Sequence, residues 1–217
     1  MRCLKLMKAI SLLSVLATTS VGCLAQTTDS EGFILVKSDP PFEVHERWVE
    51  FPDKKPAVTS RELKSEFTVK APVYKIIRVI KDESLIKSWQ VHIRDFKVYK
   101  KSDSTVWDEY SCHDVPWPLN DQDSFMEYRV KEIVPGSEYH IAFKSRVDQK
   151  LAPVQANVNR IELIGSWNLV VSQPGTVKVT YRIQSAPATN VPRMIVDPVI
   201  RNNLVAMIKS LTEIVER

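Results

Sequence analysis

Glycine and recognisable catalytic motifs are both scarce in this chain of 217 residues. Only five glycines are present, so no Gly-rich loop is available to cradle a phosphate, and the Gly-x-Ser-x-Gly and Ser-x-x-Lys patterns of nucleophilic enzymes are absent. Ser111, His113 and Asp114 lie close together in the sequence, but a catalytic triad is defined by geometry and not by adjacency. We therefore expect no catalytic residues.

Ligands for a metal ion are equally sparse. The four histidines are dispersed, and neither a His-x-x-x-His pattern nor a closely spaced pair of cysteines occurs. Both patterns bring ligands to one face of a helix or turn, as a bound metal requires. The sequence therefore predicts no metal site and no other cofactor.

The first 25 residues have the pattern of a secretory signal peptide. Three basic residues precede an apolar run at 9–17, and a region of small residues follows. This run is too short to span a bilayer. Cleavage after Ala25 would make Gln26 the mature start, whereas residues 20–23 resemble a bacterial lipobox in which Cys23 is acylated. Either route predicts export to the periplasm or the medium, with a membrane anchor through Cys23 in the second case.

Charge and cysteine content change when the signal peptide is removed. The remaining chain has 27 Lys and Arg against 26 Asp and Glu, a net charge of +1, which gives no reason to expect a nucleic-acid partner. Cys112 is then the one cysteine left for the folded domain, so an intramolecular disulfide is excluded. We expect a monomer held together by its hydrophobic core.

Alternating apolar residues predict antiparallel strands along most of the chain. Val177, Val179, Tyr181 and Ile183 alternate with polar residues, so this strand has one dry face and one wet face. The same alternation occurs at 139–147 and 161–171, and strands are also expected at 45–51 and 62–70. We interpret 26–44 as a tether and N-terminal segment and 45–217 as the folded domain.

Helices are expected at both ends of this strand-rich region. Pro72 suits the first turn of one helix, which is followed by a turn ending near Trp89. The last helix is predicted over 198–216, because apolar residues recur there every three or four positions. Asp197 is the expected N-cap of that helix, with Pro198 in its first turn, and the region from Pro192 is expected to form a short turn before it.

One segment carries a recognisable family pattern. Residues 114–123 contain Pro-Trp-Pro-Leu followed by Asn-Asp-Gln-Asp, and this resembles the Pro-Trp-Pro segment of START domains, the steroidogenic acute regulatory protein-related lipid-transfer family. The segment 160–167, which begins with Arg-Ile and ends with Gly-Ser-Trp, resembles a strand of the same family. Thr-Tyr at 180–181 and Gln-Ser-Ala-Pro at 184–187 resemble the sequence that precedes its last helix.

This resemblance implies an α+β helix-grip fold, in which a curved antiparallel β-sheet wraps around a long C-terminal α-helix and encloses an apolar cavity. It also implies a protein that binds, and in some relatives transfers, a lipid or other hydrophobic small molecule, with transient membrane contact. Polyketide aromatases and cyclases share the scaffold, so an enzyme of that kind is the first alternative. A filled-core interaction protein is the second.

Candidate ligand-binding residues follow from the resemblance and from the predicted strand faces. Glu109 matches the position of a buried Glu in some steroid-binding relatives, whereas the position of its Arg partner falls on Tyr128. Arg129 lies on the opposite face, so we expect the Tyr128 hydroxyl to bond a buried Glu109; a solvated Glu109 is the alternative. Trp117 is expected to pack in its turn or to plug one end of the cavity. The cavity candidates are Glu109, Met126, Tyr128, Phe143, Trp167, Tyr181, Leu204 and Met207.

Overall fold

The computed structural model describes residues 28–115, 117, 120–186 and 192–217. The expected signal peptide, Gln26, Cys23, Pro116 and Pro118 lie outside these residues. The elements, in chain order, are β1 (Ile34–Asp39), β2 (Phe42–Glu50), β3 (Thr59–Val69), α1 (Val73–Lys81), α2 (Ile86–Trp89), β4 (Ile93–Lys100), β5 (Val106–His113), β6 (Asp121–Val134), β7 (Glu138–Ser145), β8 (Val158–Arg160), β9 (Leu163–Gln173), β10 (Thr176–Ser185) and α3 (Arg193–Glu216).

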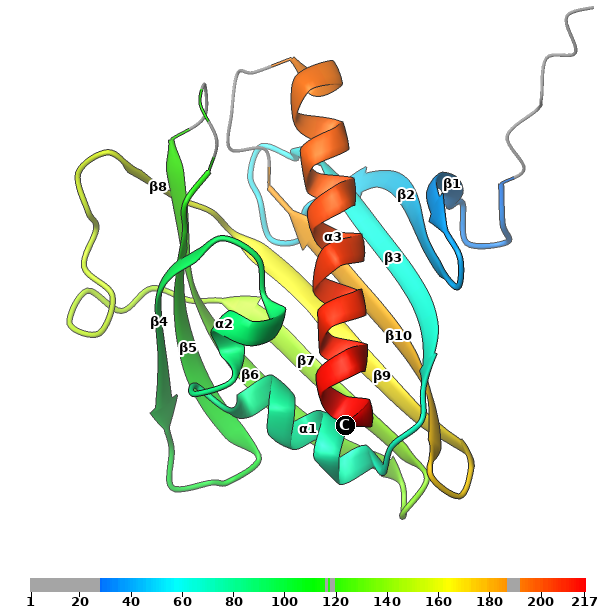
Figure 1. Cartoon of the computed structure of the whole chain (residues 1–217). Helices are drawn as coiled ribbons and strands as arrows, with labels where there is room; N and C mark the ends of the chain where they lie inside the picture. Colours follow the sequence, from blue (N-terminus) through cyan, green and yellow to red (C-terminus); the bar gives the residue numbers. More distant parts are fainter. Residues whose placement is uncertain (1–27, 116, 118–119, 187–191) are drawn as a thin grey trace, which may run out of the picture.

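The strands form one large curved sheet with the order β1-β2-β3-β10-β9-β7-β6-β5-β4. Neighbours in this order are antiparallel, and the short β8 joins β6 in parallel. The sheet is open, with β1 and β4 at its edges, and α3 lies across its concave face beside α1 and α2 (Figure 1). This arrangement confirms the predicted α+β fold of a curved antiparallel sheet around a C-terminal helix.

The dry faces of the central strands meet under α3. Val179 of β10 pairs with Leu169 of β9, and both side chains are fully buried. Ile141 of β7, also fully buried, pairs with Trp167 of β9. The predicted alternation is therefore confirmed for these strands. Val147 is an exception, because β7 ends at Ser145 and the Val147 side chain is exposed.

The N-terminal segment differs from the tether expected from its sequence. Its residues from Ile34 onward form β1, which pairs with β2 at the edge of the sheet. Phe33, just before β1, is fully buried, and the charged ends of Arg47 and Lys64 lie 4.5 and 4.4 Å from the centre of its ring. Burial of the Phe33 ring and pairing with β2 therefore hold this segment in the sheet.

The first helix begins at Val73, and Pro72 is its N-cap, one position before the first turn in which it was predicted. Its buried residues Ile76, Val79 and Ile80 share one face, at the three- and four-residue spacing of an amphipathic helix. Pro72 fits here because the start of a helix needs no backbone donor from it. This face packs under the C-terminal half of α3 (Figure 1).

The last helix begins at Arg193 and not at Pro198, so Asp197 is not its N-cap. The Asp197 carboxylate bonds Arg61 of β3 and lies 3.2 Å from Nη2 of Arg193. These ion pairs hold the first turns of α3 to the sheet, and Pro198 is tolerated close to the start of the helix. Among the described residues, no helix has the length and hydropathy needed to cross a membrane.

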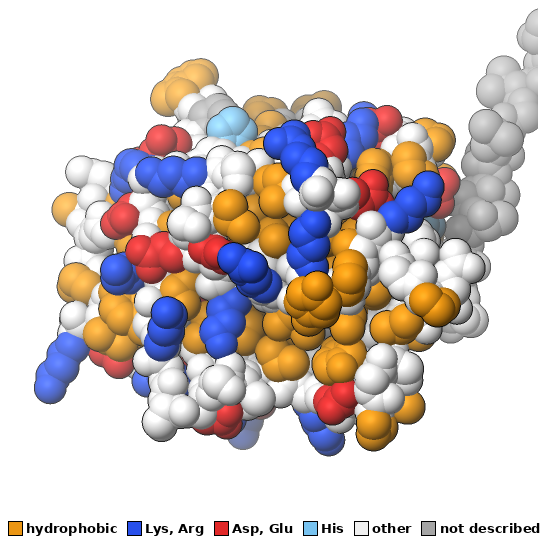
Figure 2. Space-filling view, turned by 60° about the horizontal axis from the view of Figure 1, so that its bottom comes forward, with side chains coloured by type: hydrophobic (Ala, Val, Ile, Leu, Met, Phe, Trp, Pro, Cys, Tyr) orange, Lys and Arg blue, Asp and Glu red, His pale blue; other side chains and the backbone are white. Residues whose placement is uncertain are grey.

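Charged side chains of both signs are interspersed on the surface that Figure 2 shows. This mixture agrees with the near-neutral charge expected for the chain without its first 25 residues. A single-sign field, which attracts nucleic acid or strongly acidic partners, does not develop on that face.

Candidate ligand cavity

A cavity of about 270 Å³ lies between the N-terminal half of α3 and the concave face of the sheet. Side chains of β3 and β10 form its floor, and the helix forms its roof. Most of the wall is apolar, and its hydrophobic members are Leu63, Val91, Val115, Ile161, Leu163, Tyr181, Ile183, Val196, Val199, Ile200, Leu204 and Met207.

One end of this cavity is polar. His92, His113 and Gln122 belong to the wall there, where the chain enters and leaves the turn that carries Trp117. Nδ1 of His113 lies 3.2 Å from the carbonyl oxygen of Val91, so Nδ1 carries the proton of that hydrogen bond. Burial lowers the pKa of His113, although this hydrogen bond opposes the shift. The polar end therefore presents a neutral imidazole near pH 7.

Aromatic rings fill the sheet beside the cavity. Trp107 stacks on Tyr128 with ring centres 4.9 Å apart, and Tyr128 lies 5.1 Å from Phe143. Tyr181 lies 6.2 Å from Phe143 and 4.1 Å from Trp167. Within this row Tyr181 alone borders the cavity. Trp167, for which the sequence left core and cavity wall open, is therefore a core residue.

Gly165 makes room for this aromatic row. It pairs with Phe143 across β7 and β9, and a Cβ atom at this position would lie 2.4 Å from Cζ of Phe143 and 2.3 Å from the carbonyl oxygen of Arg182. Both distances are shorter than van der Waals contact. The absence of a side chain at Gly165 thus lets the Phe143 ring lie flat against the sheet.

Glu109 is buried in the core and hydrogen-bonded. Its side chain is 1% exposed, and the Tyr128 hydroxyl donates to its Oε1 atom over 3.3 Å. Burial raises the pKa of Glu109 to about 8, more than the bond from Tyr128 lowers it. Arg129 points away and bonds Glu127. The expected Tyr128 partner is confirmed, and the solvated alternative is excluded.

The structure separates the eight sequence candidates into two groups. Tyr181, Leu204 and Met207 lie in the cavity wall. The other five are buried in the sheet but do not border the cavity; they are Glu109, Met126, Tyr128, Phe143 and Trp167.

Sequence reasoning missed several wall residues. Val196 and Ile200 share the apolar spacing of α3, so that spacing was a usable signal. His92 gave no such signal, because it lies in a loop and has a φ of +58°. Trp117 was expected to be packed, but its side chain is 91% exposed, so it neither packs in its turn nor plugs the cavity.

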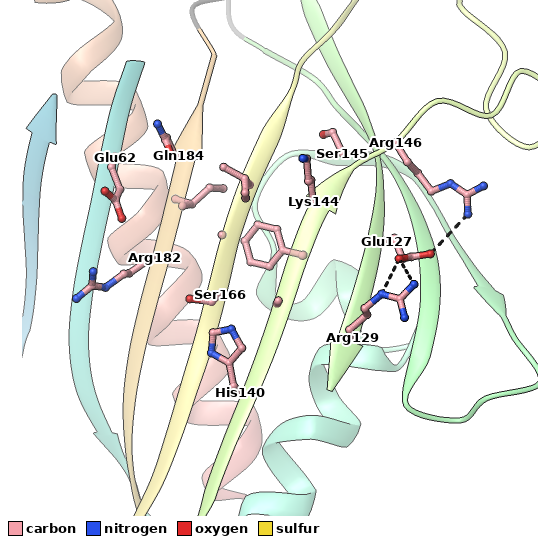
Figure 3. Close-up of a pocket in the computed structure, with 15 residues that line it drawn as sticks. Glu62, Glu127, Arg129, His140, Lys144, Ser145, Arg146, Ser166, Arg182 and Gln184 are labelled. Atoms are coloured by element: carbon pink, nitrogen blue, oxygen red, sulfur yellow. Dashed lines mark hydrogen bonds and ion pairs between the residues drawn. The ribbon is translucent and has the colours of Figure 1, made fainter. Parts of the chain in front are cut away.

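A larger hollow of about 670 Å³ lies on the opposite face of the sheet. Figure 3 shows that charged and polar side chains of several neighbouring strands border it. Glu127 there accepts hydrogen bonds from Arg129 and Lys101, and Lys144 pairs with Asp53. Charged side chains around this hollow are thus paired with charges of opposite sign. The smaller apolar cavity under α3 is therefore the better candidate for a ligand site.

Solved structures with the same architecture include several lipid-transfer proteins. The STAR-related lipid transfer protein (fragment 25–204) of Xanthomonas axonopodis superposes with a TM-score of 0.70 and 20% identity, covering 86% of this chain and 99% of that one. Human StAR-related lipid transfer protein 5 superposes with a TM-score of 0.71 and 13% identity, covering 86% of this chain and 88% of that one. The Zhui aromatase/cyclase of Streptomyces sp. R1128 superposes with a TM-score of 0.53 and 13% identity, covering 73% of this chain and 94% of that one.

These comparisons define the fold. The chain has the START-like helix-grip fold, as the residues of the Pro-Trp-Pro segment predicted. No protein-family model matches the sequence, and no curated protein matches it. The structural matches share too few identical residues to transfer an activity.

Proposed function

We propose that the protein binds a lipid or other hydrophobic small molecule in the cavity between α3 and the sheet. One observation carries this proposal: the residues that β3, β9 and most of α3 contribute to the wall are apolar, from Leu63 of β3 to Met207 of α3. An apolar ligand that leaves water for such a wall gains about 25 cal/mol for each Å² of apolar surface it buries. The few polar groups at one end set its orientation.

The size of the cavity limits the ligand. Ligand cavities usually measure about 300–1,000 Å³, and this one, at about 270 Å³, falls just below that range. It fits a single acyl chain or a small ring system better than a lipid with two chains. We expect the cavity to select ligands by the length and width of their apolar part, because a closely packed wall has no room for a longer acyl chain.

The structural matches support a binding role without deciding it. Proteins described as lipid transfer proteins occur among them, and so does an aromatase/cyclase. The described wall contains one acid, Asp114, and two imidazoles, His92 and His113, but no hydrogen bond or ion pair joins the acid to either imidazole; Nδ1 of His113 bonds the Val91 carbonyl instead. We therefore favour binding, with transfer as its consequence, over catalysis.

Delivery of a ligand requires contact with a membrane, and exposed apolar side chains support such contact. Trp117 is 91% exposed, and Met194 is 82% exposed. Each lies two residues along the sequence from a residue of the cavity wall: Trp117 from Val115, and Met194 from Val196. A monomer that touches the membrane with this end would receive its ligand through the same end.

Native mass spectrometry of protein purified from its own host tests this function. A retained lipid, identified after organic extraction, supports it. Uptake of a neutral fluorescent acyl probe by the emptied protein gives the affinity, which should be insensitive to salt because apolar burial drives binding. A bound aromatic polyketide would favour the enzyme instead. If the folded protein neither retained nor took up an apolar molecule, the binding function would be contradicted. The filled-core interaction protein would then be the remaining hypothesis.

A further inference from the structure

Three arginines converge where the first turns of α3 meet the sheet. Arg61 comes from β3, whereas Arg193 and Arg201 come from α3. Two buried carboxylates, Glu46 and Asp197, lie among them and are 2% and 8% exposed. We call these five residues the arginine cluster. Its three positive charges exceed its two negative charges.

The two carboxylates are saturated by these arginines. Oε1 of Glu46 accepts from Arg193 over 3.1 Å, and its Oε2 accepts from Arg201 over 3.0 Å. Trp48 also donates to Oε1 of Glu46, over 3.1 Å. Asp197 bonds both Arg61 and Arg193. The negative charges of both carboxylates are therefore already neutralised by arginines.

By contrast, some N–H donors of the arginines have no acceptor. Nη1 of Arg61 and Nε of Arg201 are buried and have no hydrogen-bond partner among the described residues, whereas Nε of Arg61, also without a hydrogen bond, lies 3.6 Å from Oε2 of Glu46. Arg61 is only 8% exposed, and a buried guanidinium is costly unless its donors are satisfied. An acceptor from outside these residues is therefore favoured at this position.

The arginine cluster adjoins the apolar cavity. Arg61 lies two residues from Leu63 on the same face of β3 and pairs with Ser185, and both Leu63 and Ser185 belong to the cavity wall. On α3, the wall residues Val196 and Ile200 stand next to Asp197 and Arg201. Arg193 is half exposed, with its guanidinium 4.1 Å from the ring centre of Trp48, so solvent reaches the cluster from that side.

We propose that the arginine cluster is a head-group site, and that the natural ligand is a single-chain amphiphile with an anionic head, a carboxylate or a phosphate. The chain occupies the cavity, and the head accepts hydrogen bonds from the spare donors of Arg61 and Arg201. Arg193 contacts the head from the solvent side. This inference rests on the proposed function, because it assumes that the chain enters the cavity.

Calorimetric titration with three amphiphiles of equal chain length tests it: dodecanol, dodecanoate and dodecyl phosphate, at about pH 7 where both acids are ionised. We expect the two anions to bind the wild-type protein at least about tenfold more tightly than dodecanol, as hydrogen bonds to charged groups imply. Arg61→Lys keeps the charge but removes the planar donors. It should reduce this preference, which is the ratio of two affinities of the same variant, to about twofold, while the affinity for dodecanol reports any movement of α3 caused by the altered bond to Asp197.

Arg193→Gln provides a second variant, at a half-exposed residue, and its thermal melt reports whether α3 stays in place without the ion pairs to Glu46 and Asp197. It should also reduce the preference. Lys209→Gln is the matched control, because Lys209 lies on the same helix, pairs with Asp39 and is not part of the wall; its preference should equal that of the wild type. An equal loss of preference in the control would overturn the assignment.

Other outcomes separate this inference from the proposed function. Wild-type protein that binds dodecanol as tightly as dodecanoate would show that water satisfies the spare donors, which overturns the head-group site and leaves the proposed function standing. If inorganic phosphate bound as tightly as dodecyl phosphate, the arginine cluster would be a site for a free anion. This result would overturn the proposal that the ligand is an amphiphile with its chain in the cavity. No binding of any of the three amphiphiles overturns both.

Discussion

The Tyr128 hydroxyl donates a hydrogen bond of 3.3 Å to Oε1 of Glu109, and both side chains are buried in the sheet. The two residues lie on the neighbouring strands β5 and β6. One neutral donor does not offset the loss of water around a carboxylate, so burial raises the pKa of Glu109 to about 8. At neutral pH the folded protein therefore holds Glu109 mostly as the neutral acid.

This shift predicts how stability depends on pH. Between about 4.5 and about 8, the folded state keeps a proton on Glu109 that the unfolded chain has released. The free energy of unfolding should therefore fall as the pH rises through this window, by as much as ~4 kcal/mol from this group. Urea unfolding at several pH values measures the change.

Glu109→Gln is the control for the pH effect, because the amide keeps an acceptor for Tyr128 and cannot ionise. The variant should lose the part of the pH dependence that arises from this carboxyl. If the wild type and the variant showed the same pH dependence between pH 5 and 8, Glu109 would be ionised in the fold and its pKa would be close to normal.

Gly165→Ala should destabilise the protein by about 1–3 kcal/mol, since the new Cβ would collide with the Phe143 ring and with the backbone at Arg182. Ser166→Ala, one residue along β9 on the other face, should change stability by no more than about 0.5 kcal/mol. Chemical unfolding of the two variants makes the comparison. Equal effects would mean that the sheet leaves space beside Gly165.

Trp167→Ala should cost roughly 3–5 kcal/mol, because the side chain is 2% exposed and packs against Trp89 and Tyr181. The affinity for an apolar probe should change much less than the stability, as Trp167 does not border the cavity. A stability change within about 0.5 kcal/mol would contradict its place in the core.

Processing at the N-terminus is a separate prediction. We expect the mature protein to begin at Gln26 or, as a lipoprotein, at Cys23, because a basic start, an apolar run and small residues precede these positions. Cell fractionation with mass analysis of the N-terminus identifies the product. Protein recovered from the cytoplasm with its first 16 residues intact would contradict export.

The sequence predicted the regular parts of the fold because local patterns determine them. Alternation specified β9 and β10, Pro72 marked the start of α1, and the apolar spacing marked most of α3. The Pro-Trp-Pro segment then pointed to the helix-grip arrangement, although no strand order follows from alternation alone. These features need only neighbours within a few residues along the chain.

Long-range contacts account for what the sequence did not reveal. Asp197 has the appearance of an N-cap, but its partner Arg61 lies 136 residues away, so the earlier start of α3 could not be read locally. The edge strand β1 is held by Phe33 and by pairing with β2. The cavity wall likewise combines side chains from loops, strands and α3, whose proximity only the fold establishes.

The affinity of Met207→Trp for a neutral fluorescent acyl probe tests the central claim most directly. Met207 lines the cavity from α3, and a Trp side chain there should occupy the space that a ligand needs. Leu204→Phe, on the same wall, should act in the same direction, while Ser210→Trp, on the same helix but not in the wall, should bind like the wild type. We predict at least about tenfold weaker binding for Met207→Trp, with the folded state retained in thermal melts. Equal binding by Met207→Trp and Ser210→Trp, or no saturable binding by the wild type, would contradict a ligand cavity under α3.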